Sequence, residues 1–339
     1  MSGNEFFHGK RVLVAGGTGL VGRPLVRILV DRGAQVRIAS LDNGDRAHPH
    51  VEYKSCDLTY LENCLETCEG VDIAFNLLCT KGSPKTATTK PASYFVPMIM
   101  YNTNLMEAAR RCGVESFLFT SSNCVYPPAE VFYENDPLEG PYSPNDPGAA
   151  RAKRAGEYQA RAYATEYGWN SVSIVRPANV YGPYDNFNPF NSMVVPSLIK
   201  KVAEADKEIE VWGDGSAIRD LIYTDDVARG MLLAVEKQLG PDRPINLGSG
   251  TGITIKQLVE TVVRISGKNL KIFWDTSKPS GDKKRLFDTT QARKVGFTPQ
   301  VGLEEGLRIT YNWYLENKDL AEGRYDIFNP PSARQNKTA

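Results

Sequence analysis

A glycine-rich stretch near the start of the chain restricts the fold more than any other feature. A short apolar run, residues 12–15, stops at Gly16, and an apolar-periodic segment, residues 25–30, follows Gly19 and Gly22. This order of strand, tight turn and helix is the setting in which a Gly-rich turn binds phosphate. Glycine permits a positive φ and lets backbone N–H groups approach a pyrophosphate, and the helix N-terminus adds donors and a favourable dipole. The stretch therefore predicts a dinucleotide site; the alternative is a plain strand-to-helix connection.

Strand-like and helix-like segments alternate after this turn. The sequence predicts further strands at 35–39, 51–58, 71–78, 116–122 and 171–176, and helices at 97–112 and 149–167. Alternation of this kind is typical of a parallel sheet with helices on both faces. We therefore expect an α/β fold, a Rossmann-type doubly wound parallel sheet with a smaller mixed α/β lobe.

The composition changes after Pro177, where Pro, Asn, Gly and aromatic residues become frequent. We interpret this as entry into a second lobe that covers the cofactor. The predicted sheet domain comprises 1–178 with a return at 219–250, and the substrate lobe comprises 179–218 with 251–325, including a helix at 253–266 and a strand at 270–274. Residues 326–339 are expected to be a disordered tail.

Charge and cysteine content exclude several classes of protein. The chain has 40 basic and 40 acidic residues, so neither a nucleic acid nor an anionic membrane is an expected partner. No apolar run approaches the roughly 20 residues that span a bilayer, and the first residues lack the apolar core of a signal peptide. The six cysteines show no Cys-x-x-Cys pairing, and the three histidines lie near the N-terminus. We expect a cytoplasmic protein without a bound metal, whose chemistry does not depend on histidine.

The end of the second predicted strand bears on cofactor choice. An acid there takes the adenosine ribose hydroxyls, whereas an arginine favours a 2′-phosphate. Ser40 occupies the usual position, Asp42 follows two residues later, and Arg37 and Arg46 are close in sequence. These residues favour NAD over NADP without excluding NADP.

Eight stretches, the glycine turn among them, together resemble the extended short-chain dehydrogenase/reductase superfamily, and within it the NAD-dependent epimerases and dehydratases of nucleotide sugars. The similarity covers about residues 10 to 318 and is greatest to the GDP-L-fucose synthase group, which acts on GDP-4-keto-6-deoxymannose. The matching stretches are 16–22, 57–58, 121–127, 176–183, 185–189, 212–215, 246–250 and 313–315. The resemblance implies an NAD(P)-dependent enzyme that acts on a nucleotide sugar, with GDP as the expected nucleotide.

In this family a Ser or Thr, a Tyr and a Lys four residues after the Tyr carry the redox step. The resemblance places the serine at Ser122 and the lysine at Lys153, but the position of the tyrosine is occupied by Ala149. A phenol near a lysine cation is a usable base, whereas alanine has no titratable proton. We therefore expect C4 oxidation or reduction to be impaired. An engineered Tyr→Ala change is the simplest explanation; a natural variant with a relocated base and a pseudoenzyme are the alternatives.

The sequence departs from the family pattern a second time, at the residues that serve epimerisation. In the fucose synthase group a cysteine two residues after the serine works with a histidine as acid and base at C3 and C5. Cys124 fits the cysteine position, but Met193 falls where the histidine is expected, and methionine cannot transfer a proton. Cys124 is then either an acid–base group or a packing residue. The Asp-Glu pair of the 4,6-dehydratases is replaced by Asn123 and Cys124, which argues against dehydration.

The resemblance also implies binding residues and a partner. Besides the three glycines, the implied cofactor residues are Thr18, Leu20, Val21, Ser40, Asp42, Asp57, Leu58, Leu77, Thr120, Lys153 and Pro177. The implied or candidate substrate residues are Asn123, Asn179, Met193, Val195, Lys201, Trp212, Arg219 and Lys284. A homodimer that packs the 97–112 and 149–167 helices into a four-helix interface is expected.

Three functional hypotheses follow. The first is an NAD(P)-dependent GDP-sugar oxidoreductase or epimerase that acts at C4 through a 4-keto species. The second is a C3/C5 epimerase of a 4-keto nucleotide sugar that uses Cys124, and the third is a dinucleotide-binding pseudoenzyme.

Overall fold

The computed structural model describes residues 5–80, 89–142, 147–189, 191–278 and 281–322. The sequence alternation produces a seven-stranded sheet in which every pair of neighbours is parallel. Its spatial order is β11 (Ile245–Leu247), β7 (Val172–Pro177), β5 (Ser116–Thr120), β4 (Ile73–Asn76), β1 (Arg11–Ala15), β2 (Gln35–Ser40) and β3 (Glu52–Ser55). The order reverses direction at β1, which is the mark of a doubly wound sheet. The predicted fold class is confirmed.

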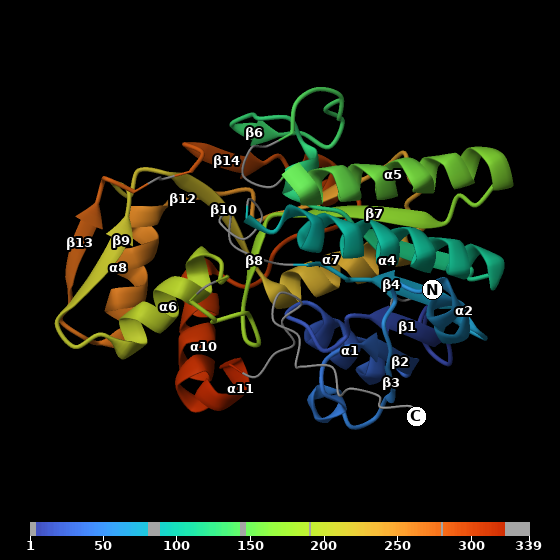
Figure 1. The fold of residues 1–339 in the computed structure, drawn as a ribbon, viewed down its shortest axis with the longest axis horizontal. Helices are drawn as coiled ribbons and strands as arrows, with labels where there is room; N and C mark the ends of the chain where they lie inside the picture. The colour runs from blue at the N-terminus through green and yellow to red at the C-terminus, as the bar shows by residue number, and fades with distance from the viewer. Residues whose placement is uncertain (1–4, 81–88, 143–146, 190, 279–280, 323–339) are drawn as a thin grey trace, which may run out of the picture.

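Helices cover both faces of this sheet (Figure 1). Alternate residues of each strand point to opposite faces, so Val12 and Val14 pack in one core with helices α1 (Gly22–Asp31) and α7 (Thr224–Glu236). Leu13 and Ala15 pack in a second core on the other face. The helices of that face are α2 (Leu61–Cys68), α4 (Pro91–Arg111) and α5 (Pro147–Tyr167). The two cores hold the carboxyl ends of the strands at a common edge.

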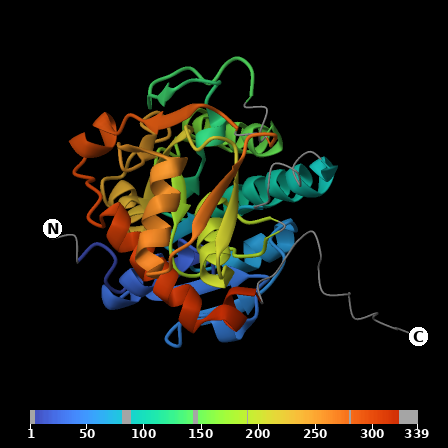
Figure 2. The ribbon, with the colours of Figure 1, turned by 90° about the vertical axis from the view of Figure 1, so that its left-hand side faces the viewer.

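A smaller lobe lies beyond that edge, with its own core and two short sheets (Figures 1 and 2). The five-stranded sheet contains β12 (Gly252–Thr254), β10 (Ile218–Tyr223), β14 (Lys284–Phe287) and β6 (Val131–Phe132), with β8 (Asn179–Tyr181) beside β10. A separate pair joins β13 (Lys271–Asp275) to β9 (Glu208–Trp212). The helices of the lobe are α6 (Val194–Glu204), α8 (Ile255–Ser266), α10 (Leu303–Glu316) and α11 (Lys318–Glu322), whereas α9 (Thr290–Lys294) places Ala292 in the core that α1 and α7 share with the large sheet. Two 3₁₀ helices, η1 (Gly44–Arg46) and η2 (Asn123–Val125), occur in loops that follow β2 and β5.

Two elements differ from the sequence prediction. Helix α4 begins at Pro91 and contains Pro97, whereas we expected a start at Pro97. Pro91 takes the first helical position, where a missing N–H has no cost, and buried Tyr94 and Met98 one turn apart hold the added segment against the core. Within the expected return at 219–250, β11 joins the large sheet, but β10 pairs in the smaller one.

The division into two domains at the predicted boundaries stays a prediction. The expected disordered tail, 326–339, lies outside the described residues. Within the described ranges, the structure has no helix long and apolar enough to cross a membrane.

Candidate active site

The glycine turn has the geometry of a phosphate cradle. Gly16 adopts a φ of +82°, and its N–H donates to the carbonyl of Ala39 at 2.8 Å. A Cβ added at Gly22 would lie 2.3 Å from the Gly16 carbonyl oxygen, so only glycine lets α1 approach the turn this closely. Along the described chain no side chain caps the start of α1. The Arg23 N–H donates to the Gly19 carbonyl at 3.1 Å and Pro24 has no N–H, so the Gly22 N–H is the one that the first turn of α1 offers to an anion.

Thr18, in the same turn, contacts the end of β2 and the loop after it through its hydroxyl. Its Oγ1 donates to the Asp42 carboxylate at 2.7 Å and lies 3.0 Å from the Ser40 hydroxyl. The Asp42 N–H in turn donates to Ser40 Oγ at 3.1 Å. Asp42 lies two residues after the expected position at Ser40, but the loop after β2 brings its carboxylate into contact with the glycine turn. This places an acceptor where the ribose of a dinucleotide is held in this fold.

The other cofactor candidates line the same edge of the sheet. Leu77 follows β4, Thr120 ends β5 and Pro177 ends β7. Asp57 and Leu58 follow β3, and Asp57 Oδ1 accepts from the N–H and hydroxyl of Thr59 at 2.9 and 2.8 Å. The carboxyl edge of a doubly wound sheet is its ligand edge. The parallel topology therefore brings these residues to one edge.

Leu20, Val21 and Thr120 complete this edge. Val21 precedes α1, and buried Leu20 accepts a hydrogen bond from the Thr224 hydroxyl at 2.7 Å. Thr120 Oγ1 is buried without a hydrogen-bond partner in the described part of the chain. A buried hydroxyl without a partner is costly and indicates a missing ligand or water. The turn, the uncapped helix and this hydroxyl fit a dinucleotide.

Lys153 is buried at the same edge, at 1% exposure. Its Nζ donates to the carbonyl oxygens of Thr120 at 2.7 Å and Leu78 at 3.2 Å, so the ammonium bridges the ends of β5 and β4. Burial lowers the pKa of Lys153, and the thiols of Cys79 and Cys124 act in the opposite direction. The amine is thus fixed in position by the backbone rather than by a carboxylate.

Ser122 and Cys124 lie together just beyond β5. Ser122 precedes η2, and its Oγ accepts from the Cys124 N–H at 3.4 Å and donates to Asn123 Oδ1 at 3.4 Å. The Cys124 side chain is 2% exposed, and Ala149, one turn before Lys153 on α5, is 5% exposed. Serine, thiol and lysine therefore come from the segments that the sequence predicts. No phenol projects from position 149.

A buried ion pair behind this site was not found from the sequence. Glu157, one turn after Lys153 on α5, accepts from Arg176 Nε at 2.9 Å and Nη2 at 2.7 Å, and from Ser121 Oγ at 2.6 Å. Burial disfavours the carboxylate, but Arg176 and Ser121 together hold the pKa of Glu157 below its ordinary value. The network fixes the residue before Ser122 to the helix of Lys153. The spacing 149, 153, 157 places Glu157 on the same helix face as Lys153, but no sequence pattern pairs it with Arg176.

The substrate candidates are spread over the smaller lobe. Asn179 Nδ2 donates to the Asp220 carbonyl at 3.1 Å, and Lys201 Nζ donates to the Glu210 carbonyl at 2.9 Å. Met193 is 39% and Trp212 56% exposed, whereas Val195 is 2% exposed within the lobe core.

Two cationic candidates lie on neighbouring strands. In the register of β10 and β14, Ile218 is opposite Lys284 and Arg219 is opposite Arg285. Burial and the nearby Arg285 guanidinium lower the pKa of Arg219. Lys284 Nζ lies 3.5 Å from a Glu130 carboxylate oxygen. Two adjacent arginines are suited to hold a diphosphate.

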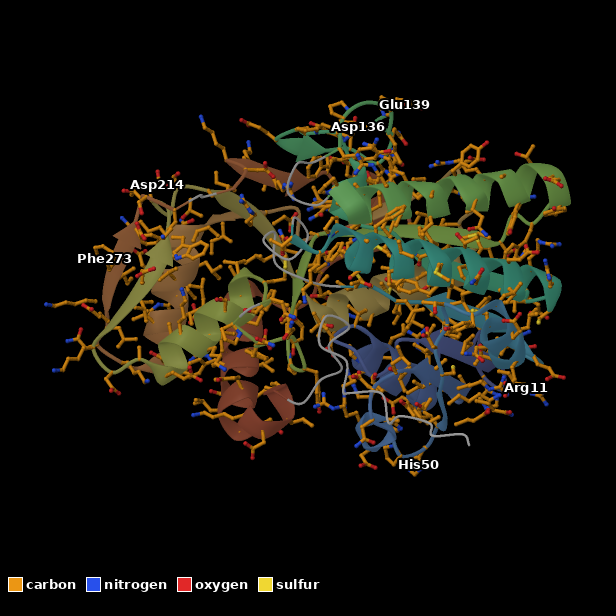
Figure 3. The ribbon with its side chains drawn as sticks, viewed as in Figure 1. Arg11, His50, Asp136, Glu139, Asp214 and Phe273 are labelled. Atoms are coloured by element: carbon orange, nitrogen blue, oxygen red, sulfur yellow. The ribbon has the colours of Figure 1, made fainter. Side chains whose placement is uncertain are left out.

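Figure 3 places His50 at the periphery of the sheet domain, on the side opposite Asp214 and Phe273 of the smaller lobe. One cavity of about 350 Å³ adjoins the glycine turn and is lined in part by Gly17, Arg23 and Tyr184. Among the described residues, no group of three or more His, Cys, Asp and Glu side chains could hold a metal ion.

The fold and the turn define a doubly wound α/β protein with a Gly-rich turn of the dinucleotide-binding type. A family model described as the NAD dependent epimerase/dehydratase family matches residues 12–248. The chain therefore belongs to the NAD-dependent epimerase/dehydratase family.

Similarity to known proteins supports this family assignment. The chain is 35% identical to "Probable GDP-L-fucose synthase 1" of Oryza sativa subsp. japonica, over 91% of this chain and 93% of that one. It is 32% identical to GDP-L-fucose synthase of Escherichia coli K12, over 93% and 99% of the chains. The solved UDP-glucose 4-epimerase of Thermus thermophilus, in complex with NAD, aligns with a TM-score of 0.75 and 26% identity, covering 90% of this chain and 99% of that one.

Proposed function

We propose that this protein is an NAD-dependent nucleotide-sugar oxidoreductase or epimerase that acts at sugar C4 through a 4-keto species. The observation that carries the proposal is Lys153, whose ammonium bridges the ends of β4 and β5 at Thr120, two residues before Ser122 in the chain. Membership of a family of NAD-dependent epimerases supports the reaction class. The similarity to GDP-L-fucose synthases supports GDP as the nucleotide.

The chain's residues supply binding, orientation and charge. A bound nicotinamide dinucleotide would accept or donate the hydride. The Gly16–Gly22 turn would hold its pyrophosphate and Asp42 its adenosine ribose. Ser122 would donate a hydrogen bond to the C4 oxygen, and Lys153 would stabilise negative charge beside it. Arg219 and Arg285 would hold the diphosphate of the sugar nucleotide.

Ala149 removes the usual route for the proton. A positioned acid or base contributes roughly 10² to 10⁴-fold to such a rate, so the chain should turn over slowly compared with a variant that has a phenol. Replacing Ala149 by tyrosine, four residues before Lys153, should raise turnover about 100-fold or more.

The experiment is to mix GDP-4-keto-6-deoxymannose with NADH and follow absorbance at the nicotinamide band for the wild type, Ala149→Tyr and the control Ala155→Tyr. We expect a large gain only for Ala149→Tyr. Absence of both NADH oxidation with any 4-keto nucleotide sugar and NAD⁺ reduction with any 4-hydroxy nucleotide sugar, in the Ala149→Tyr protein, would contradict the proposal.

The C3/C5 epimerase is the second candidate, because the Cys124 N–H is bonded to the Ser122 hydroxyl at the site. Met193 stands where that chemistry needs a second proton carrier, and it is 39% exposed on the smaller lobe. Incubating the 4-keto sugar with the protein in deuterated water distinguishes the two activities. Deuterium at C3 and C5 would support epimerisation, and its absence would exclude it.

Calorimetric binding measurements distinguish the third hypothesis, a pseudoenzyme, from the two enzymatic ones. A non-catalytic dinucleotide sensor would bind NADH but no nucleotide sugar. We expect binding of GDP-sugars, with a weaker signal from the Arg219→Ala variant.

A further inference from the structure

Strand β13 pairs with a neighbour along one edge only. It lies beside β9 at the outer end of the smaller lobe (Figure 1). The Lys271 N–H and the Asp275 carbonyl each bond to a residue that flanks β9, at 2.9 and 2.8 Å. Successive residues of a strand turn their backbone groups to opposite edges, so Ile272 and Trp274 turn theirs away from β9. Within the described ranges no strand pairs with β13 along that edge.

The other free edge of this two-stranded sheet, along β9, is blocked by a lysine. Gly213, just after β9, donates its N–H to β13, so the same alternation turns the backbone groups of Glu210 to the outer edge. There the Glu210 carbonyl accepts from Lys201 Nζ at 2.9 Å. A lysine on a strand edge is one of the features by which proteins prevent further strand pairing. Among the described residues no lysine blocks the edge of β13 in this way, so this is the edge that can accept another strand.

The outward face of β13 is complementary to itself. Phe273 is 59% exposed at its centre, with exposed Lys271 two residues before it and Asp275 two residues after it. The Asp275 carboxylate is fixed at the end of the strand, since its Oδ1 accepts from the N–H and the hydroxyl of Ser277 at 3.0 and 2.6 Å. A second copy of β13, laid antiparallel with Phe273 opposite Phe273, would place each lysine opposite the aspartate of the other copy. Opposite charges and aromatic rings directly across a strand pair stabilise it.

The backbone of β13 favours the same register. With Phe273 opposite Phe273, the outward groups of Ile272 in one copy meet those of Trp274 in the other, which is the hydrogen-bonded pair of an antiparallel ladder. A slip of two residues would place Lys271 opposite Phe273 and leave the charges unmatched. One register therefore satisfies the backbone groups and the charges together.

We propose that β13 binds β13 of a second copy of this chain, antiparallel about a twofold axis at Phe273, so that the two small sheets become one four-stranded sheet. Helices α4 and α5, where a homodimer interface is expected, lie at the other end of the molecule, so both contacts can form at once (Figure 1). Five residues from each copy make a small interface, and small interfaces are weak. The contact should therefore link dimers only at about 100 μM protein or above.

The first test is disulfide trapping with Phe273→Cys and the matched control Glu210→Cys, which lies beside position 273 on the same face. In the proposed pairing the thiols at position 273 face each other with Cβ atoms about 5 Å apart, close enough for a disulfide. Those at position 210 are three strand spacings apart, about 14 Å. Oxidation at about 100 μM by oxidised glutathione, followed by peptide mass spectrometry, should give at least about tenfold more of the 273–273 disulfide than of the 210–210 disulfide. Equal yields, or a higher yield at position 210, would overturn the proposal.

The second test exchanges the charges in the Phe273→Cys background. Lys271→Asp places two acidic pairs across the interface and should lower the yield of the 273–273 disulfide about fivefold. Adding Asp275→Lys restores opposite charges and should return the yield to within about twofold of the starting protein. Circular dichroism and NADH binding report whether each variant is folded, because both features are independent of the contact. Equal yields in the three proteins, or no recovery in a folded double variant, would contradict the pairing, and the first test decides if the double variant does not fold.

Discussion

Asp42 is the residue that we expect to make the protein prefer NAD to NADP. Its carboxylate accepts from Thr18 at 2.7 Å, beside the turn that would hold the pyrophosphate. The nearby arginines are directed elsewhere: Arg37 contacts Glu52 at 2.8 Å, and Arg46 donates to the Leu320 carbonyl at 2.8 Å. A 2′-phosphate would therefore meet an anion rather than a cation.

We predict that the wild type binds NADH at least about tenfold more tightly than NADPH, because like charges repel at the ribose. Asp42→Asn should reduce this preference, mainly by improving NADPH binding. Calorimetric titration of both cofactors checks it, with Asp45→Asn in η1 as the matched control. Equal affinities in the wild type would contradict the assignment of Asp42.

Helix α5 is the element on which the site depends, since positions 149, 153 and 157 lie one turn apart on it. Glu157 and Arg176 are both buried, at 0% and 1% exposure, and make two hydrogen bonds to each other. Arg176 also donates to the Tyr126 hydroxyl at 2.9 Å, and this hydroxyl donates to Asn246 at 2.7 Å. The network thus joins α5, β7 and β11 behind the site.

Glu157→Gln should destabilise the fold by about 3–5 kcal/mol, because it leaves the Arg176 charge buried without a counter-ion. Urea unfolding followed by circular dichroism measures this, and Glu166→Gln on the exposed part of the same helix is the control. If Glu157→Gln lowers the free energy of unfolding no more than Glu166→Gln does, the Glu157–Arg176 ion pair contributes little to stability.

The sequence predicts these elements well where a repeating physical pattern marks them. The strands of the large sheet are short apolar runs between turn residues, and Gly16–Gly22 has a spacing that few other functions require. Contacts between distant residues carry no such pattern, so the Glu157–Arg176 pair appears only when α5 is packed on β7, and the contacts of Lys153 with the Leu78 and Thr120 carbonyls only when α5 meets the ends of β4 and β5. Pro97 misled the prediction of α4 because either of two prolines could begin the helix, and packing of Tyr94 decided between them.

At the scale of the whole molecule, α4 and α5 present one face to the sheet and another to solvent. Met98 and Leu105 on α4 are fully buried within the protomer. Met100 on α4 and Tyr158 on α5 are 40% and 74% exposed. We propose that this exposed face forms the four-helix interface of a homodimer, since burying large aromatic side chains stabilises association.

Sedimentation velocity checks this assembly. The wild type should sediment as a dimer, and Tyr158→Glu should weaken the dimer by placing a charge in its interface. Tyr60→Glu, at a residue 60% exposed before α2, should have no effect. A monomeric wild type at micromolar concentration would refute the proposed interface.

The most direct measurement of the central claim is the transfer of deuterium from NADH deuterated at the reactive nicotinamide carbon to a 4-keto GDP-sugar, in the Ala149→Tyr protein. The account predicts deuterium at sugar C4, located by NMR of the product, and loss of that label with Lys153→Met. Absence of deuterium from C4, or label at C4 that persists at the same rate without Lys153, would contradict it.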